Sequence, residues 1–229
     1  MYKRQDEYRA KTVILAMGAQ PKRLGLPGEI ELGGRGVSTC GVCDGAFFKG
    51  EDVIVVGGGD SAMEDAMFIA KYANKLTVVH RRDEFRASKI MLERAKATPN
   101  IEFKTPYAPE EFVAGEDGKI GTLKLKNAEN GEEKELKVGG AFVAIGHTPR
   151  SELVVGQVET DDEGYVITEG KSTRTNLAGV FAVGDLVDHT YRQAVTAAGT
   201  GCAAALDAER FLASLEAAGV THDVEQALV

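Results

Sequence analysis

The sequence has no tryptophan, only three cysteines, and no uninterrupted apolar run that could cross a membrane. A transmembrane helix needs about 18 consecutive apolar residues, so we expect no membrane partner. Three cysteines in a chain that opens without a signal-peptide pattern argue against a structural disulfide framework and favour a reducing, cytoplasmic compartment. Basic residues are outnumbered, since 27 lysines and arginines against 35 acidic residues give a formal net charge of −8. This balance argues against a nucleic-acid partner.

Glycine is abundant instead, with 27 in 229 residues, and three glycines directly follow the apolar run Val53–Val56. That run predicts a buried strand, and a helical pattern continues from Asp60 to about Tyr72. Gly-x-Gly-x-x-Ala between a strand and a helix predicts a loop that binds a dinucleotide pyrophosphate. The first glycine allows the tight turn, and the second lets the backbone approach the phosphates. The residues predicted to hold the pyrophosphate are Gly57, Gly58, Gly59, Asp60 and Ser61.

The next predicted strand, Leu76–His80, indicates which dinucleotide to expect. An NAD site would place a carboxylate at the end of this strand to hold the ribose 2′-hydroxyl. Here the strand ends in His80, Arg81 and Arg82, and Arg86 follows one helical turn later. These fixed or potential cations suit a 2′-phosphate, so we predict NADPH. The alternative is an ordinary basic surface after a strand.

The segment Cys40-Gly-Val-Cys43-Asp44 carries two of the three cysteines. Two cysteines at this spacing can close a small disulfide ring, so the pair can switch between dithiol and disulfide. Zinc is the competing interpretation, but a structural zinc site normally needs four ligands. The remaining cysteine, Cys202, lies in a predicted helix of small residues, where we expect it to be packed as an apolar side chain. We therefore predict a redox pair and no metal.

The rest of the chain predicts a mixture of strands and helices. Residues 119–126 and 133–138 alternate apolar and charged side chains around Asn130-Gly131, which is typical of a hairpin. The other predicted elements are buried strands at 11–17, 140–145 and 179–183, a short strand at 101–104, a helix at 86–96, a hairpin at 159–168, and a long helix from Gln193 or Ala194.

Taken together, these motifs resemble the low-molecular-weight, bacterial-type thioredoxin reductases. The likeness runs from about Tyr8 to Leu215. The segments that carry it, in the family's order, are Cys40-Gly-Val-Cys43-Asp44, the Gly57 loop, His80–Arg86, Gly184-Asp185 and Tyr191-Arg-Gln-Ala194.

The resemblance implies an α/β flavoenzyme in which a Rossmann-like NADPH domain is inserted into a second α/β domain that binds FAD. Residues 21–145 would form the NADPH domain with the redox pair, and residues 1–20 and 146–229 would belong to the FAD domain. Cys40 would attack oxidised thioredoxin, Cys43 would face the flavin, and Asp44 would protonate the departing thiolate. Members of the family are homodimers. The residues that would contact cofactors also include Ile145, Gly146, Gly184, Asp185, Arg192, Gln193 and Ala194.

The resemblance is incomplete at the start of the chain. The family opens with an FAD-binding βαβ unit that has its own glycine-rich loop, and this sequence has no second loop of that kind. We therefore expect the second domain to be truncated at its N-terminus, to bind FAD poorly and to expose apolar surface. Taken alone, Asp185 fits an ordinary turn or helix-capping aspartate better than a cofactor contact. Two further alternatives are an NADPH-binding fragment without turnover and a related flavoprotein that reduces peroxiredoxin-type partners.

Overall fold

The computed structural model describes residue 6 and residues 8–219, and it divides the chain into two compact units. One unit, here called the inner unit, is Pro21–Gly146. The other, the outer unit, combines Met1–Gln20 with His147–Val229. Among the described residues, no helix is both long and apolar enough to span a membrane.

The inner unit is built on a five-stranded sheet in which every neighbouring pair is parallel. The apolar run at residues 53–56 forms its central strand, as the sequence predicts, because four consecutive residues there are buried. Continuous burial on both faces is typical of a parallel strand covered on each side. In sheet order the strands are β3 (Val37–Ser38), β10 (Gly140–Val143), β4 (Asp52–Val56), β5 (Lys75–Val79) and β6 (Ile101–Lys104).

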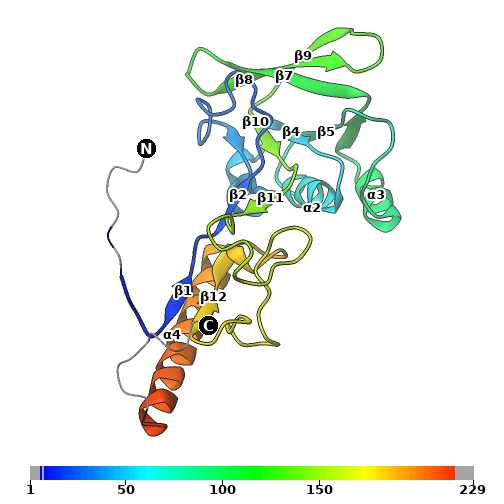
Figure 1. Ribbon diagram of the computed structural model, residues 1–229. Coiled ribbons are helices and arrows are strands. Elements are labelled where there is room, and N and C mark those ends of the chain that lie inside the picture. Colours follow the sequence, from blue (N-terminus) through cyan, green and yellow to red (C-terminus); the bar gives the residue numbers. More distant parts are fainter. Residues whose placement is uncertain (1–5, 7, 220–229) are drawn as a thin grey trace. The chain divides into compact units, whose positions relative to one another are not determined.

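Different layers cover the two faces of this sheet (Figure 1). Val53 and Val55 point to one face, where they pack with α2 (Asp60–Ile69) and α3 (Lys89–Lys96). Ile54 and Val56 point to the other face and pack with an antiparallel sheet. Its strands are β7 (Tyr107–Ala114), β8 (Ile120–Asn127) and β9 (Glu133–Lys137), in that order. Each buried Val or Ile side chain contributes about 1.5–3 kcal/mol through loss of contact with water, so this three-layer packing holds the strand ends firmly.

The antiparallel sheet confirms the predicted hairpin around Asn130-Gly131 and adds a strand that the sequence did not reveal. β8 and β9 pair as the alternation predicts. β7 was missed because Pro109 interrupts it and its register against β8 shifts twice, which disturbs the simple alternation of buried and exposed residues. The predicted helix at 86–96 is also shorter in the structure, because it begins at Lys89.

The outer unit contains a long helix and two short strand pairs. α4 (Ala194–Ala217) begins where the sequence predicts, with Gln193 as its N-cap. β1 (Val13–Leu15) runs parallel to β12 (Val180–Ala182), and β2 (Ala19–Pro21) pairs with β11 (His147–Pro149).

Two expectations for the outer unit are wrong, and a third is confirmed in a shorter form. The strand predicted as buried at 11–17 spans only β1, and Val13 and Ile14 are 46% and 42% exposed, because β12 is its sole neighbour among the described strands. The hairpin predicted at 159–168 is present in a short form, with an antiparallel bridge between Thr160 and Val166 and a backbone hydrogen bond from Ile167 to Glu159. Cys202 is exposed rather than packed in the core, since it lies on an outward face of α4.

Candidate functional site

A pocket of about 670 Å³ opens at the carboxyl ends of β4, β5 and β10, entirely within the inner unit. This edge of a parallel sheet is where open α/β folds bind ligands. Apolar residues also line the pocket, including Leu24, Leu26 and Pro109, the last of which belongs to β7. The predicted site residues that line it are Gly57, Gly58, Gly59, Ser61, His80, Arg81, Arg82, Arg86, Ile145 and Gly146. Asp60 does not line it, because its carboxylate accepts the backbone N–H of Ser88 at 2.6 Å.

The glycine loop is shaped by close packing at one position and open space at another. A Cβ on Gly57 would overlap the carbonyl oxygen of Ala144 and would lie 2.7 Å from the Cβ of Ala62. A Cβ on Gly59 would meet nothing within 4 Å. Gly57 therefore lets strand and helix meet, whereas Gly59 leaves room for a ligand at the start of α2. The helix dipole favours an anion there.

His80 lies against the glycine loop rather than reaching into solvent. A Cβ on Gly58 would come within 2.6 Å of the His80 ring nitrogens. Nε2 of His80 lies 3.2 Å from the carbonyl oxygen of Glu84, which can only accept, so Nε2 carries the proton. Burial lowers the pKa of His80 below its usual 6.5, and the nearby positive charges of Arg81, Arg82 and Arg86 lower it further, against the hydrogen bond to Glu84. His80 is therefore neutral at neutral pH, whereas the sequence placed it among the potential cations.

The positive charge at this end of the pocket comes from Arg81, Arg82 and Arg86, which are all exposed. Within the described residues, no carboxylate forms an ion pair with any of the three guanidinium groups. The backbone N–H groups of Arg86 and Ala87 both donate to the carbonyl oxygen of Gly58, at 2.8 and 3.0 Å. The basic turn is thereby tied to the glycine loop, and its charges remain available to an anion in the pocket.

Cys40 and Cys43 are joined in a disulfide with an S–S distance of 2.01 Å. Cys40 is the N-cap of α1 (Gly41–Asp44) and is half-buried, whereas Cys43 is exposed. The carboxylate of Asp44 accepts the hydroxyl of Ser38 at 2.6 Å, and the same hydroxyl oxygen accepts the N–H of Cys40 at 3.1 Å. The sequence alone did not identify Ser38 as a site residue, because a serine six residues before an acid is not a recognisable motif.

The predicted cofactor residues of the outer unit gather around the start of α4. Gly184 begins a short 3-10 helix, η2 (Gly184–Leu186), and its N–H donates to the hydroxyl of Thr200 on α4 at 3.0 Å. Asp185 follows it and is half-buried. Gln193 and Ala194 are the N-cap and first residue of α4. The structure thus brings Gly184, Asp185, Gln193 and Ala194 to one end of this helix.

Arg192, just before this helix, has an unusual backbone. Its φ of +49° lies in the left-handed region that favours glycine. Asp188 holds the segment in place by accepting the N–H groups of Thr190, Tyr191 and Arg192 at 2.8–2.9 Å. Burial alone would raise the pKa of Asp188, but these donors outweigh it and the pKa is lowered. Because Nη1 of Arg192 also donates to Tyr165 Oη at 2.9 Å, the whole residue is fixed. Such enforced strain is common at functional sites.

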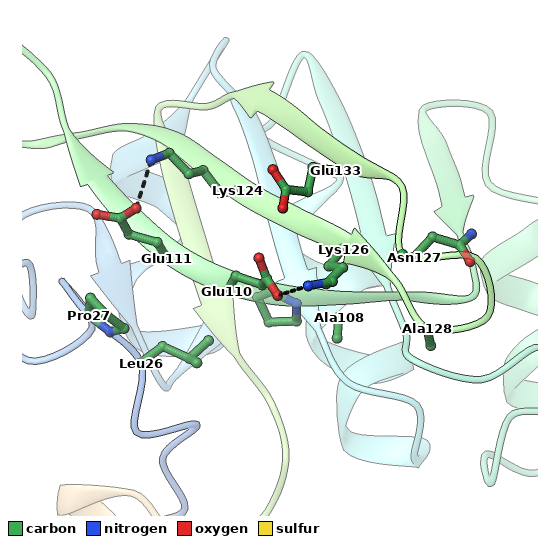
Figure 2. Close-up of a pocket in the computed structure, with 12 residues that line it drawn as sticks. Leu26, Pro27, Ala108, Glu110, Glu111, Lys124, Lys126, Asn127, Ala128 and Glu133 are labelled. Atoms are coloured by element: carbon green, nitrogen blue, oxygen red, sulfur yellow. Dashed lines mark hydrogen bonds and ion pairs between the residues drawn. The ribbon is translucent and has the colours of Figure 1, made fainter.

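A second hollow of about 760 Å³ lies over the antiparallel sheet, and both of its lysines are paired with glutamates (Figure 2). Lys124 contacts Glu111 at 2.8 Å, and Lys126 contacts Glu110 at 3.5 Å. Ion pairs of this kind leave little net charge for a ligand, so we assign no site there.

Several known proteins with similar sequences and structures are thioredoxin reductases. A family model described as pyridine nucleotide-disulphide oxidoreductase matches residues 2–201. A thioredoxin reductase of Mycolicibacterium smegmatis is 60% identical over 208 residues, which cover 91% of this chain and 66% of that protein. A thioredoxin reductase of Streptomyces clavuligerus is 56% identical and covers 91% of this chain and 64% of its own length. The crystal structure of thioredoxin reductase from Streptococcus pyogenes MGAS5005 is 42% identical with a TM-score of 0.84, over 89% of this chain and 66% of that one. The chain thus spans slightly less than two thirds of these relatives.

Proposed function

The chain belongs to the pyridine nucleotide-disulphide oxidoreductase family, and we propose that it serves the NADPH-dependent reduction of the thioredoxin disulfide. The observation that carries this proposal is the pocket of the inner unit, which combines a glycine loop with three arginines that form no ion pair within the described part of the chain. The redox disulfide Cys40–Cys43 belongs to the same unit. The reaction requires a site for NADPH, which differs from NADH by its 2′-phosphate, and a disulfide that can be reduced.

The inner unit is assigned the NADPH site. The open space beside Gly59 fits a pyrophosphate at the start of α2. Arg81, Arg82 and Arg86 fit the 2′-phosphate, and no carboxylate is paired with them among the described residues. His80 contributes shape rather than charge, because its ring supports the loop at Gly58. Ile145 and Gly146, which line the same pocket, complete the nucleotide site.

The outer unit is assigned the FAD contacts. Gly184 and Asp185 would meet the ribityl chain, and the rigid segment of Arg192, Gln193 and Ala194 would lie beside the ring system. Bound FAD would supply a carrier that accepts hydride from NADPH and passes two electrons to the disulfide. The half-buried Asp185 carboxylate and the fixed Arg192 fit hydroxyl and ring acceptor groups of this kind.

The chain's own cysteines perform the final exchange. In the reduced form, the Cys40 thiolate attacks the thioredoxin disulfide, so a Cys40–partner bond forms while the partner's S–S bond breaks. Cys43 then displaces the partner and restores the Cys40–Cys43 disulfide. Two electrons and two protons pass to thioredoxin, and Asp44 delivers protons to the departing thiolates. A reducing compartment such as the cytoplasm and assembly as a homodimer are parts of the same proposal.

A second candidate is nucleotide binding without turnover. It is favoured by the confinement of the pocket and the disulfide to the inner unit, which could bind NADPH regardless of whether FAD is held. The two candidates differ in whether the chain passes electrons from NADPH to a disulfide.

The test combines nucleotide binding with disulfide reduction. NADPH and NADH are titrated into the purified chain and into the variant Arg81→Ala/Arg82→Ala, with Arg94→Ala/Lys96→Ala on α3 as a control of equal charge change. One charge-assisted hydrogen bond contributes about 1.5–3 kcal/mol, so loss of both arginines should weaken NADPH binding by at least about tenfold and NADH binding little. Equal losses for both nucleotides would refute the 2′-phosphate site.

Electron transfer is measured separately, after incubation with excess FAD. Wild-type chain should oxidise NADPH in the presence of oxidised thioredoxin, and Cys40→Ser should not. NADPH binding without any such oxidation would favour the second candidate.

A further inference from the structure

We propose that Ser38 is a positioning residue for disulfide exchange, whose hydroxyl holds the carboxyl group of Asp44 in place beside the Cys40–Cys43 pair. This inference rests on the proposed function, because it concerns the proton that the exchange requires. It adds a group that does not stand out in the sequence.

One hydroxyl makes both of the bonds that matter. Ser38 Oγ donates to Asp44 Oδ2 at 2.6 Å and accepts the N–H of Cys40 at 3.1 Å. A serine hydroxyl has one hydrogen and two lone pairs, so the two bonds form at the same time. Asp44 and the backbone of the first cysteine are therefore linked through a single oxygen atom.

Ser38 is anchored in the parallel sheet, whereas Asp44 is not. Ser38 ends β3, and its backbone pairs with the fully buried Phe142 of β10. Asp44 ends α1, a helix of only four residues. So short a helix has little stability of its own in water, and a half-exposed aspartate can adopt several rotamers. The hydrogen bond to Ser38 thus transfers the rigidity of the sheet to the carboxyl group.

The bond also distinguishes the two carboxyl oxygens. Oδ2 is occupied by Ser38, while Oδ1 accepts no hydrogen bond from any residue that the structure describes. Oδ1 is therefore the oxygen that can carry the proton for a departing thiolate. When Ser38 is lost, the carboxyl group can rotate and the proton is no longer presented to the sulfur at a fixed place.

The need for this proton depends on the leaving group. When the Cys40 thiolate attacks a disulfide R–S–S–R, one R–S⁻ leaves and takes a proton from Asp44. The Cys43 thiol then passes its own proton to Asp44, and the Cys43 thiolate displaces the second R–S⁻, which Asp44 protonates in turn. An alkyl thiol has a pKa of about 8.5, so its thiolate leaves slowly unless it is protonated. An aromatic nitrobenzoate thiolate has a far lower pKa and leaves without help. Ser38 should matter for the first kind of disulfide and not for the second.

The experiment uses the reduced 229-residue chain and two probes, hydroxyethyl disulfide and an aromatic nitrobenzoate disulfide. Formation of the Cys40–Cys43 disulfide is timed by quenching with a thiol-alkylating reagent. Ser38→Ala should slow the reaction with hydroxyethyl disulfide about tenfold, a part of what a general acid contributes, and change the aromatic reaction less than about twofold. Ser38→Thr keeps the hydroxyl and should restore the alkyl reaction. Thr39→Ala is the matched control, because the neighbouring half-buried hydroxyl makes no hydrogen bond within the described residues.

A double-mutant cycle separates positioning from damage to the fold. Asp44→Asn should slow the alkyl reaction at least as much as Ser38→Ala, and the double variant should be no slower than Asp44→Asn alone, since residues that act together are not additive. Equal slowing of both probes by Ser38→Ala, or an unchanged alkyl reaction, would overturn the proposal. A wild-type dithiol that reduces neither probe would instead overturn the proposed function and this inference with it.

Discussion

Two glycines of the glycine loop should respond differently to substitution by alanine. Gly57→Ala should change the stability of the fold, whereas Gly59→Ala should change NADPH binding. A Cβ at Gly57 would overlap the carbonyl oxygen of Ala144 and crowd Ala62, and both neighbours are fixed by the sheet and by α2. Neither can move without a backbone shift, and overpacking of this kind costs about 1–3 kcal/mol. Replacing a glycine also restricts the unfolded chain, and this alone would raise the free energy of unfolding by about 0.4–1 kcal/mol. Gly57→Ala should therefore lower the free energy of unfolding by about 1–2 kcal/mol.

Gly59→Ala is the matched substitution with the opposite expected result. Gly59 has φ −101° and ψ −179°, which any residue adopts, and an added Cβ meets nothing within 4 Å. The free energy of unfolding should stay the same or rise by up to about 1 kcal/mol. NADPH binding should weaken, because the new methyl group would stand in the pocket where the pyrophosphate approaches the backbone.

Urea denaturation followed by circular dichroism measures the first quantity, and NADPH titration measures the second. A Gly57→Ala variant within about 0.5 kcal/mol of wild type would refute the packing argument. A Gly59→Ala variant that binds NADPH as tightly as wild type would show that the pyrophosphate does not lie on this loop.

Three further predictions concern single side chains. His80 has a lowered pKa when folded, so the unfolded chain binds more protons below about pH 6.5. Wild type should lose stability from about pH 7 to pH 5 in urea melts, and His80→Gln should show a shallower loss. Lys124→Ala should leave the urea midpoint unchanged, because its ion pair with Glu111 is solvent-exposed. Asp207→Ala should destabilise the outer unit by about 1–3 kcal/mol in thermal melts, because it removes the carboxylate that accepts the N–H and the hydroxyl of Thr173. An Asp207→Ala variant that melts like wild type would contradict this.

The sequence predicts the central strand, the glycine loop and the hairpin around Asn130-Gly131 because each depends on local pattern. Burial on both faces leaves an uninterrupted apolar run, as at Val53–Val56. A long run of small residues with helical periodicity likewise predicts α4. These features are fixed by neighbours in the chain, so a single sequence is enough to find them.

What the sequence could not supply are contacts between distant residues. The charge state of His80 depends on burial against Gly58, which lies 22 residues earlier. The exposure of β1 depends on which strands pair with it, and its apolar composition alone suggested a buried strand. Ser38 acquires a role only because β3 and α1 bring its hydroxyl to Asp44. Local pattern determines the elements, and tertiary packing determines the chemistry of the side chains they carry.

One helix connects the two chemical centres of the inner unit. α2 begins at the glycine loop, and its later turns pack against the disulfide segment, where a Cβ on Gly41 would lie 2.5 Å from the Asp65 side chain and one on Gly45 would lie 3.1 Å from Ile69. Five residues of helix from Asp60 to Asp65 span only about 7.5 Å. A shift of α2 forced by Gly57→Ala would therefore also displace the disulfide segment, whereas loss of the Ser38 hydroxyl leaves α2 in place. Measuring NADPH affinity and alkyl disulfide exchange on both variants thus distinguishes a change transmitted through the helix from one confined to the carboxyl group.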